Sequence, residues 1–160
     1  MVGLVETMQM TADSSRPEPS REAGFVLVER TPTVAEYQRL NVAVGWGQVV
    51  EENAAVGLPR SLYSVCAVKG GEVVGCGRVV GDGGLYFYVQ DLVVLPEHRR
   101  KGIGHAMMDA IMAYVGGTAK PGAFIGLMAA RGYAGFYTRY GFAERPANAP
   151  GMFMRWGQRP

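Results

Sequence analysis

The chain has 160 residues, a formal net charge of +2 and 48% hydrophobic residues, which fits one domain with a substantial core. A nearly neutral chain is not typical of a dedicated nucleic-acid binder, which carries a strong basic excess. No apolar run reaches the roughly 18 residues of a membrane helix, and the start MVGLVETMQM is unlike a secretory signal. We therefore expect a cytoplasmic protein with no nucleic-acid or membrane partner.

The start of the chain predicts a tail. Its first 22 residues include the polar, proline-bearing run TADSSRPEPSRE, whose composition is typical of disorder. We expect a flexible tail over 1–22 and a single domain over 23–160.

The domain is expected to begin with a strand and two helices. FVLVER (25–30) has strand composition, and Thr33 offers an N-cap. Helical spacing follows at Val34, Tyr37, Leu40 and Val44. A second short helix is expected at 49–56.

Residues 61–95 carry three strand-like runs, separated by the turn signals Gly70-Gly71 and Asp82-Gly83-Gly84. This pattern predicts an antiparallel meander. Cys66 and Cys76 fall on neighbouring strands of it. Without a signal peptide we expect reduced core thiols, with a disulfide between them as the alternative.

The second half predicts a helix from 101 to 114 that stops at Gly116-Gly117, a buried strand at 123–129 and a short helix at 132–140. Two closing strands are expected at 141–144 and 151–156. The element order is then β-α-α-β-β-β-α-β-α-β-β. This is an α/β (α+β) fold, with a mixed, mostly antiparallel sheet of 6–7 strands flanked by about four helices. The strand–helix–strand step predicts one parallel pair, where a ligand cleft can open.

Three basic residues and two glycines stand where the helix at 101–114 should begin. A first helical turn presents unpaired N–H groups and a partial positive charge, and glycine lets a ligand approach the backbone. Arg99 to Gly104 therefore predict a pyrophosphate cradle, with a solvated basic turn as the alternative. Met107 stands where the dinucleotide fingerprint needs its third glycine, which excludes that motif.

The run Arg99-Arg100-Lys101-Gly102-Ile103-Gly104 resembles the signature Arg/Gln-x-x-Gly-x-Gly/Ala of the GNAT superfamily of N-acetyltransferases. The preceding VQDLVVLPEH resembles that superfamily's fourth strand and loop. GFYTRYGF (135–142) resembles its second marker, a tyrosine four residues before Gly-Phe. The resemblance covers about 24–157 and is strongest over 89–142.

The resemblance implies the GNAT fold and an enzyme, an acetyl-CoA-dependent N-acetyltransferase. It would transfer an acetyl group to a primary amine of a small molecule by direct attack on the thioester. A non-catalytic acetyl-CoA-binding sensor or scaffold is the alternative. A homodimer is possible, because this is the commonest assembly.

The resemblance also assigns residues to acetyl-CoA. The loop would grip the pyrophosphate and the fourth strand would pair with the pantetheine arm, with the Val94 N–H as oxyanion donor. Tyr137 would contact the cofactor and protonate the departing thiolate. The cofactor-binding set is Leu92, Val93, Val94, Arg99, Arg100, Lys101, Gly102, Ile103, Gly104 and Tyr137.

The general base and the acceptor site remain open at this level. Tyr88 stands where histone-type members carry glutamate, and Asp91 is the only carboxylate of the strand. Asp91 would hold or deprotonate the ammonium group or serve as a structural hydrogen-bond acceptor, and a water chain is the third option. The acceptor-binding candidates are Trp46, Arg78, Tyr88, Gln90 and Met128. Cys and His show no ligand spacing, so no metal is expected, and His98 and His105 are expected on the surface.

Overall fold

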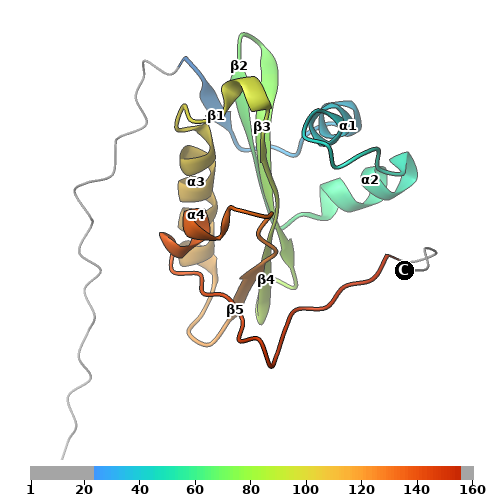
Figure 1. Ribbon diagram of the computed structural model, residues 1–160. Helices are drawn as coiled ribbons and strands as arrows, with labels where there is room; N and C mark the ends of the chain where they lie inside the picture. Colours follow the sequence, from blue (N-terminus) through green and yellow to red (C-terminus); the bar gives the residue numbers. More distant parts are fainter. Residues whose placement is uncertain (1–23, 156–160) are drawn as a thin grey trace, which may run out of the picture.

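A five-stranded sheet lies between two helical layers in the computed structural model, which describes residues 24–155 (Figure 1). The tail expected at 1–22 lies outside the described residues. α3 and α4 cover one face of the sheet, and α1 and α2 lie on the other. The elements are, in chain order, β1 (Val26–Val28), α1 (Val34–Ala43), α2 (Glu51–Gly57), the 3-10 turn η2 (Leu58–Arg60), β2 (Tyr63–Lys69), β3 (Glu72–Gly81), β4 (Tyr86–Val94), the 3-10 turn η3 (Pro96–His98), α3 (Ile103–Thr118), β5 (Phe124–Leu127) and α4 (Ala134–Thr138).

The strands follow chain order across the sheet, β1-β2-β3-β4-β5. The first four are antiparallel, and β5 is parallel to β4, joined to it through α3. The predicted meander and the predicted parallel pair are therefore confirmed. The second turn is tied by Asp82, whose Oδ1 accepts the N–H groups of Gly84, Leu85 and Tyr86 at 2.8–2.9 Å.

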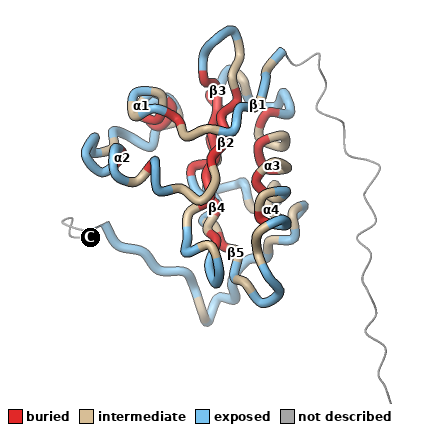
Figure 2. Tube along the Cα trace, turned by 180° about the vertical axis from the view of Figure 1, so that it is seen from behind, coloured by how far each residue is buried: buried red, intermediate tan, exposed pale blue. Residues whose placement is uncertain are grey.

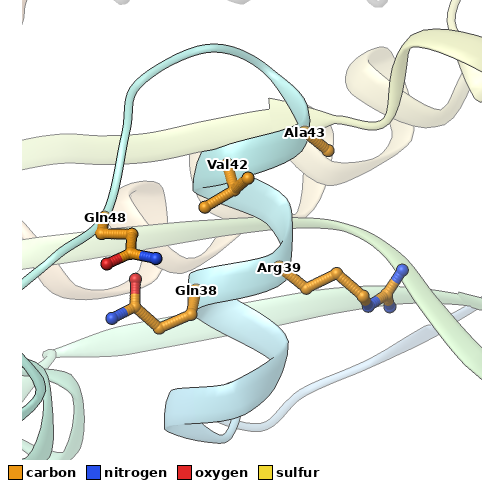
Figure 3. A pocket seen from close by; sticks show the side chains of 5 residues that line it. All are labelled: Gln38, Arg39, Val42, Ala43 and Gln48. Atoms are coloured by element: carbon orange, nitrogen blue, oxygen red, sulfur yellow. The ribbon is translucent and has the colours of Figure 1, made fainter.

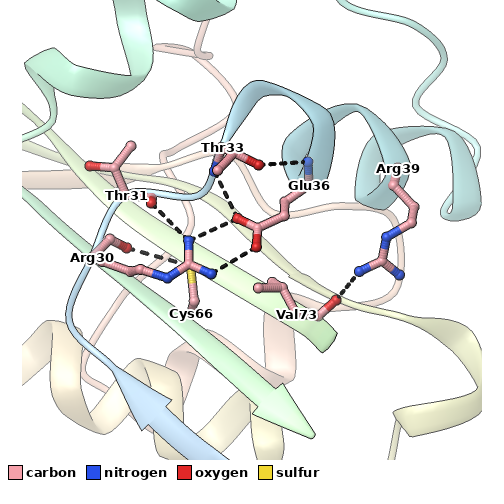
Figure 4. Close-up of polar contacts among 7 residues, drawn as sticks. All are labelled: Arg30, Thr31, Thr33, Glu36, Arg39, Cys66 and Val73. Carbon is pink, nitrogen blue, oxygen red and sulfur yellow. Dashed lines mark hydrogen bonds and ion pairs between the residues drawn. The ribbon is translucent and has the colours of Figure 1, made fainter. Parts of the chain in front are cut away.

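A capping box starts α1 and ties it to the chain that precedes it (Figure 4). The Glu36 N–H donates to Thr33 Oγ1 at 3.2 Å, and the Thr33 N–H donates to Glu36 Oε2 at 2.8 Å. The Arg30 guanidinium donates to both oxygens of Glu36, at 2.8 and 2.7 Å. This hydrogen-bonded pairing with Arg30 lowers the pKa of Glu36 to about 2. α1 is thus fixed over the sheet at its first turn.

The core lies between α3 and the sheet, with a smaller part under α1 (Figure 2). Met107, Met108 and Ile111 of α3 are fully buried, as is Phe87 of β4. α3 approaches the sheet closely at Gly77: a Cβ there would lie 2.9 Å from Ile111 Cδ1. A glycine on β3 therefore sets the distance of the helix that carries the signature loop.

The predicted closing strands are absent from the described residues 141–155, which corrects the expected count of 6–7 strands to five. Trp156, the last residue expected in the second strand, lies outside the described part. Pro146 and Pro150 interrupt the segment and cannot donate to a strand ladder. Met152, Phe153 and Met154 are 91%, 76% and 75% exposed, so their apolar run is not buried against the sheet.

The predicted stop of the long helix at Gly116-Gly117 is wrong, because α3 continues to Thr118. Each glycine costs about 1 kcal/mol relative to alanine in a helix. Val115 is buried against the core, and its carbonyl accepts the Ala119 N–H at 2.8 Å. Packing and the continued hydrogen bonding outweigh the local glycine signal.

Cys66 and Cys76 are free and buried, and they face each other across β2 and β3. Burial raises the pKa of Cys66 to about 11 and raises that of Cys76 as well. Both therefore stay protonated thiols at neutral pH. Among the described residues, no helix has the length and apolar character needed to cross a membrane.

Candidate functional site

The signature loop leaves β4 and delivers free backbone donors to the start of α3. Arg100 has φ 58° and Gly102, the N-cap of α3, has φ 80° with no side-chain cap. The first helical bond runs from the Ala106 N–H to Gly102 O at 2.9 Å. Within the described part of the chain, the six backbone N–H groups from Arg100 to His105 have no hydrogen-bond partner. Such a row of donors at a helix start is suited to a phosphate group.

The basic side chains of the loop divide into two roles. Arg99 Nε donates to Val94 O at 3.2 Å, and Lys101 Nζ donates to Glu97 O at 2.8 Å. These two side chains therefore stabilise the loop through hydrogen bonds to the carbonyls of the preceding segment. Arg100 is exposed and makes no hydrogen bond to the described residues. The backbone is therefore the main anion-binding element, and Arg100 is the side chain free to add charge.

The carboxyl end of β4 has one open edge. Its parallel pairing with β5 ends at Val89 opposite Leu127, whereas its pairing with β3 continues to Val94. The Leu95 N–H donates to Val74 O at 2.9 Å and so points toward β3. Successive peptide groups of a strand point to opposite edges, so the Val94 N–H points to the open edge. This edge can accept an extended amide-bearing ligand.

A β-bulge in β4 precedes the open edge. Gln90 pairs with Arg78 and Val93 pairs with Cys76, so Asp91 and Leu92 together face the single residue Gly77. Asp91 has φ 56°, a conformation that costs a non-glycine residue about 1–2 kcal/mol. A Cβ on Gly77 would lie 3.0 Å from Leu92 Cδ1, so glycine makes room for the bulge. The bulge decides which peptide groups beyond it face the open edge.

α4 places Tyr137 beside this end of the sheet. A Cβ on Gly104 would lie 3.9 Å from both Val94 Cγ2 and the Phe136 ring, so β4, α3 and α4 meet there. The Tyr137 ring stands perpendicular to Phe136 with centroids 5.0 Å apart. Burial raises the pKa of Tyr137, with a smaller contribution from Tyr133. Its hydroxyl has no partner among the described side chains and is available to a ligand.

The two histidines are half-buried, which differs from the expected surface positions. His105 Nδ1 lies 2.9 Å from Tyr140 Oη, and its ring centroid lies 4.7 Å from that of Phe136. His105 thus joins the first turn of α3 to α4. His98 Nδ1 is buried without a hydrogen-bond partner among the described residues. No local pattern marks the environment of His105, because Phe136 and Tyr140 lie about 30 residues further along the chain.

Asp91 and Arg78, predicted for catalysis and acceptor binding, are bound to each other. Arg78 Nε and Nη2 lie 2.7 and 2.6 Å from Asp91 Oδ2, and the side chains are 11% and 5% exposed. Asp91 Oδ1 accepts the Gln90 amide at 3.0 Å, and Arg78 Nη1 donates to Ser61 Oγ at 2.9 Å. The Arg78 guanidinium lies 5.7 Å from the Tyr37 ring of α1. Both charges are engaged within the protein.

The other acceptor candidates are more accessible. Gln90 is exposed and Tyr88 is half-buried, and both precede the bulge on β4. Burial raises the pKa of Tyr88. Met128 follows β5 and is 66% exposed, and Trp46 lies between α1 and α2 and is 48% exposed. Four of the five candidates are thus at least partly exposed, whereas Arg78 is buried in its pair with Asp91.

A shallow depression lies on α1 and the segment that follows it (Figure 3). Its volume is about 490 Å³, and Gln38, Arg39, Val42, Ala43 and Gln48 line it. It shares no residue with the signature loop, β4 or α4, so we do not assign the chemistry to it. In the described chain, no cluster of His, Cys, Asp and Glu side chains could hold a metal ion.

Comparisons with known proteins identify the family of the chain. The model of the acetyltransferase (GNAT) domain family matches residues 59–144, more than half of the chain. A crystal structure of a probable acetyltransferase from Staphylococcus aureus is 27% identical, with a TM-score of 0.79, over 82% of this chain and 99% of that one. A GNAT-family acetyltransferase from Streptococcus pneumoniae is 29% identical, with a TM-score of 0.65, over 85% of this chain and 99% of that one.

A more distant structure shares the fold alone. Glucosamine-6-phosphate N-acetyltransferase from Arabidopsis thaliana is 15% identical, with a TM-score of 0.58, over 82% of this chain and 99% of that one. The chain matches no curated protein sequence.

Proposed function

Because the chain belongs to the GNAT acetyltransferase family, we propose that it transfers the acetyl group of acetyl-CoA to a primary amine of a small molecule. The observation that carries this proposal is the row of unpaired N–H groups from Arg100 to His105 at the start of α3. A diphosphate ester needs several convergent donors, and this loop supplies them without a metal ligand set.

The loop and the open strand edge would share the binding of acetyl-CoA. The N–H groups of Arg100 to His105 would hold the pyrophosphate, and the Arg100 guanidinium would add charge. The pantetheine arm would lie along the open edge of β4 at Leu92 to Val94, as one more strand of the sheet, and the Val94 N–H would be the donor that faces it. The Val94 N–H would then donate to the thioester oxygen.

The acetyl transfer follows from these positions. The lone pair of the neutral amine attacks the thioester carbon, a C–N bond forms, and the carbonyl oxygen gains negative charge. The Val94 N–H stabilises this oxyanion. As the oxyanion collapses, the C–S bond breaks and Tyr137 donates its phenolic proton to the departing thiolate. The proton released from the amine passes to solvent, and solvent returns a proton to Tyr137.

The proton acceptor for the amine is solvent in this proposal. The Asp91 carboxylate is 95% buried at its side chain and already accepts hydrogen bonds from Arg78 and Gln90. Both carboxylate oxygens are therefore engaged within the protein, which argues against Asp91 as the base. Burial raises the pKa of Tyr88, so its phenol stays protonated, and water is the acceptor that this proposal uses.

The acceptor would lie against the exposed side of β4, near Tyr88 and Gln90. Trp46 and Met128, which come from other segments, are the further candidates for contact with it. Aromatic and apolar side chains favour an amine with an apolar body. Among the described residues, these positions carry no free acidic cluster. This favours a small amine without further charges over a basic peptide.

The test is an acetyl-transfer screen against mixed primary amines, read by release of the coenzyme A thiol. We expect transfer to at least one small amine and a thermal shift with coenzyme A, since a ligand at 100 times its Kd adds about 2.7 kcal/mol. A shift without transfer to any amine would favour the sensor or scaffold alternative. No shift at all would remove the proposal.

A further inference from the structure

Two non-glycine residues in the described chain have positive φ, and both flank the proposed acetyl-CoA site. Arg100 lies in the signature loop, and Asp91 lies in the bulge of β4. A left-handed residue inside a strand persists only where its surroundings hold it. The question is what holds Asp91 in this conformation.

The contacts of the Asp91 side chain show which residue holds it in this conformation. Arg78 Nε and Nη2 lie 2.7 and 2.6 Å from Asp91 Oδ2, across the strand pair at the bulge. Arg78 Nη1 donates a hydrogen bond to Ser61 Oγ at 2.9 Å, and the Gln90 amide donates to Asp91 Oδ1 at 3.0 Å. The guanidinium is thereby fixed from both ends. A buried charge pair with these additional hydrogen bonds has one favourable arrangement.

We propose that Arg78 and Asp91 form a positioning pair that holds the β4 bulge and so aims the Val94 N–H at the thioester. The proposal rests on the proposed acetyl transfer. The bulge adds one residue to β4 relative to β3. Because peptide groups alternate between the two edges of a strand, losing the extra residue would exchange their directions. The Val94 N–H would then face β3 instead of the open edge.

The first experiment separates positioning from proton transfer at Asp91. Asn adopts the left-handed region more readily than most residues and still accepts from Arg78, but it cannot act as a base. We expect Asp91→Asn to keep kcat within about fivefold of the wild type, and Asp91→Ala to lower kcat at least tenfold, as loss of an oxyanion donor does. Loss of activity in Asp91→Asn equal to that in Asp91→Ala would overturn the proposal.

The second experiment tests whether Arg78 acts through the Asp91 backbone. The double variants Arg78→Met/Asp91→Gly and Arg78→Met/Asp91→Ala both remove the buried charges, and they differ only in tolerance of positive φ. We expect the glycine version to recover at least fivefold more kcat than the alanine version, with Kd for coenzyme A within threefold between them. Equal kcat values in two folded variants would overturn the proposal.

A readout without activity keeps this inference distinct from the proposed function. Amide chemical shifts of Leu92 to Val94, recorded without ligand, should stay near wild type in Asp91→Asn and move in Asp91→Ala. Shifts that do not move in Asp91→Ala contradict the positioning role. If wild type fails to bind coenzyme A or transfer acetyl, the proposed function fails, and this comparison still decides whether Asp91 holds the bulge.

Discussion

Tyr137 carries a protonated phenol on α4, next to Phe136, whose ring lies beside Gly104 of α3. Burial raises its pKa above the ordinary value of 10.0, so the phenol stays protonated throughout the neutral and mildly alkaline range. The same shift makes the phenol a weaker acid than a thiol, so its proton moves to the thiolate only as the C–S bond breaks, and solvent then returns a proton to the phenolate.

We expect Tyr137→Phe to lower kcat by about 100-fold or more, because a general acid contributes on that scale. The hydroxyl has no partner among the described residues, so the free energy of unfolding should change by less than about 1 kcal/mol. Thiol release measures kcat, and denaturant unfolding measures stability. An unchanged kcat would show that solvent, not Tyr137, protonates the thiolate.

Glu36 carries a pH dependence that belongs to the fold and not to the site. Its pKa is lowered from 4.5 to about 2 by its hydrogen bonds with Arg30. A lowered carboxyl pKa contributes stability that is present above pH 4.5 and is lost as the pH falls toward 2.

The matched variant is Glu36→Gln, which can still accept the Thr33 N–H of the capping box but does not titrate. We expect its unfolding free energy to fall less steeply than that of the wild type between pH 4.5 and 2. Urea unfolding at a series of pH values provides the measurement. Parallel curves for the two proteins would refute the assignment.

Residue identity predicted the loop and Tyr137, but it did not predict how Asp91 and Arg78 meet. Their pairing depends on a bulge that one unpaired residue creates, and no local pattern in VQDLVV marks it. Gly77 is the nearest signal, because only glycine leaves room for Leu92 there. Of the roles that the sequence leaves open for Asp91, the contact with Arg78 corresponds to the structural hydrogen-bond acceptor.

At the scale of elements, the loop and first turn of α3 act as one unit in which two glycines have different tasks. Gly102 has φ 80°, whereas Gly104 lies inside the helix with ordinary contacts around its position. The same substitution at the two positions therefore separates the effect of a positive φ from the effect of an added Cβ.

We expect Gly102→Ala to strain the loop by about 1–2 kcal/mol and to weaken coenzyme A binding at least tenfold. Gly104→Ala should add up to about 1 kcal/mol of stability and leave binding within threefold. Calorimetric titration and thermal unfolding distinguish the two. Equal losses of affinity would mean that the region rejects any Cβ, and that backbone conformation is not the cause.

Elements with local signals were predicted well. The order from β1 to α4 followed from turn glycines and hydrophobic periodicity, and Figure 1 shows that order. α3 passes through Gly116-Gly117 because Val115 is buried, a fact that lies in the packing and not in the local sequence. The two closing strands were predicted from composition alone, and the described residues 141–144 and 151–155 do not pair with the sheet.

At the scale of the whole molecule, the sheet separates the proposed roles. α3 and α4 lie on one face with the signature loop and Tyr137, and α1 and α2 lie on the other with Tyr37 over Arg78 (Figure 1). The Arg78–Asp91 pair connects the second face to the bulge in β4.

The exposed end of the chain gives a test at this scale. We expect Phe153→Ser, at a residue that is 76% exposed, to change the unfolding free energy by less than about 0.5 kcal/mol. Phe87→Ala, the fully buried control, should cost about 3–5 kcal/mol. Chemical denaturation measures both. A large loss in Phe153→Ser would mean that this segment packs in solution, and a concentration-dependent Tm would identify a second copy as its partner.

The central claim is that the backbone of Arg100 to His105 binds the diphosphate of coenzyme A. The most direct measurement is a titration of the amide-labelled full chain with coenzyme A, following the chemical shift of each backbone amide. The account predicts saturable shifts concentrated at residues 100–105 and 92–94, and their loss in Gly102→Ala. Saturable shifts confined to the depression lined by Gln38 and Gln48, or no saturable shifts, would contradict it.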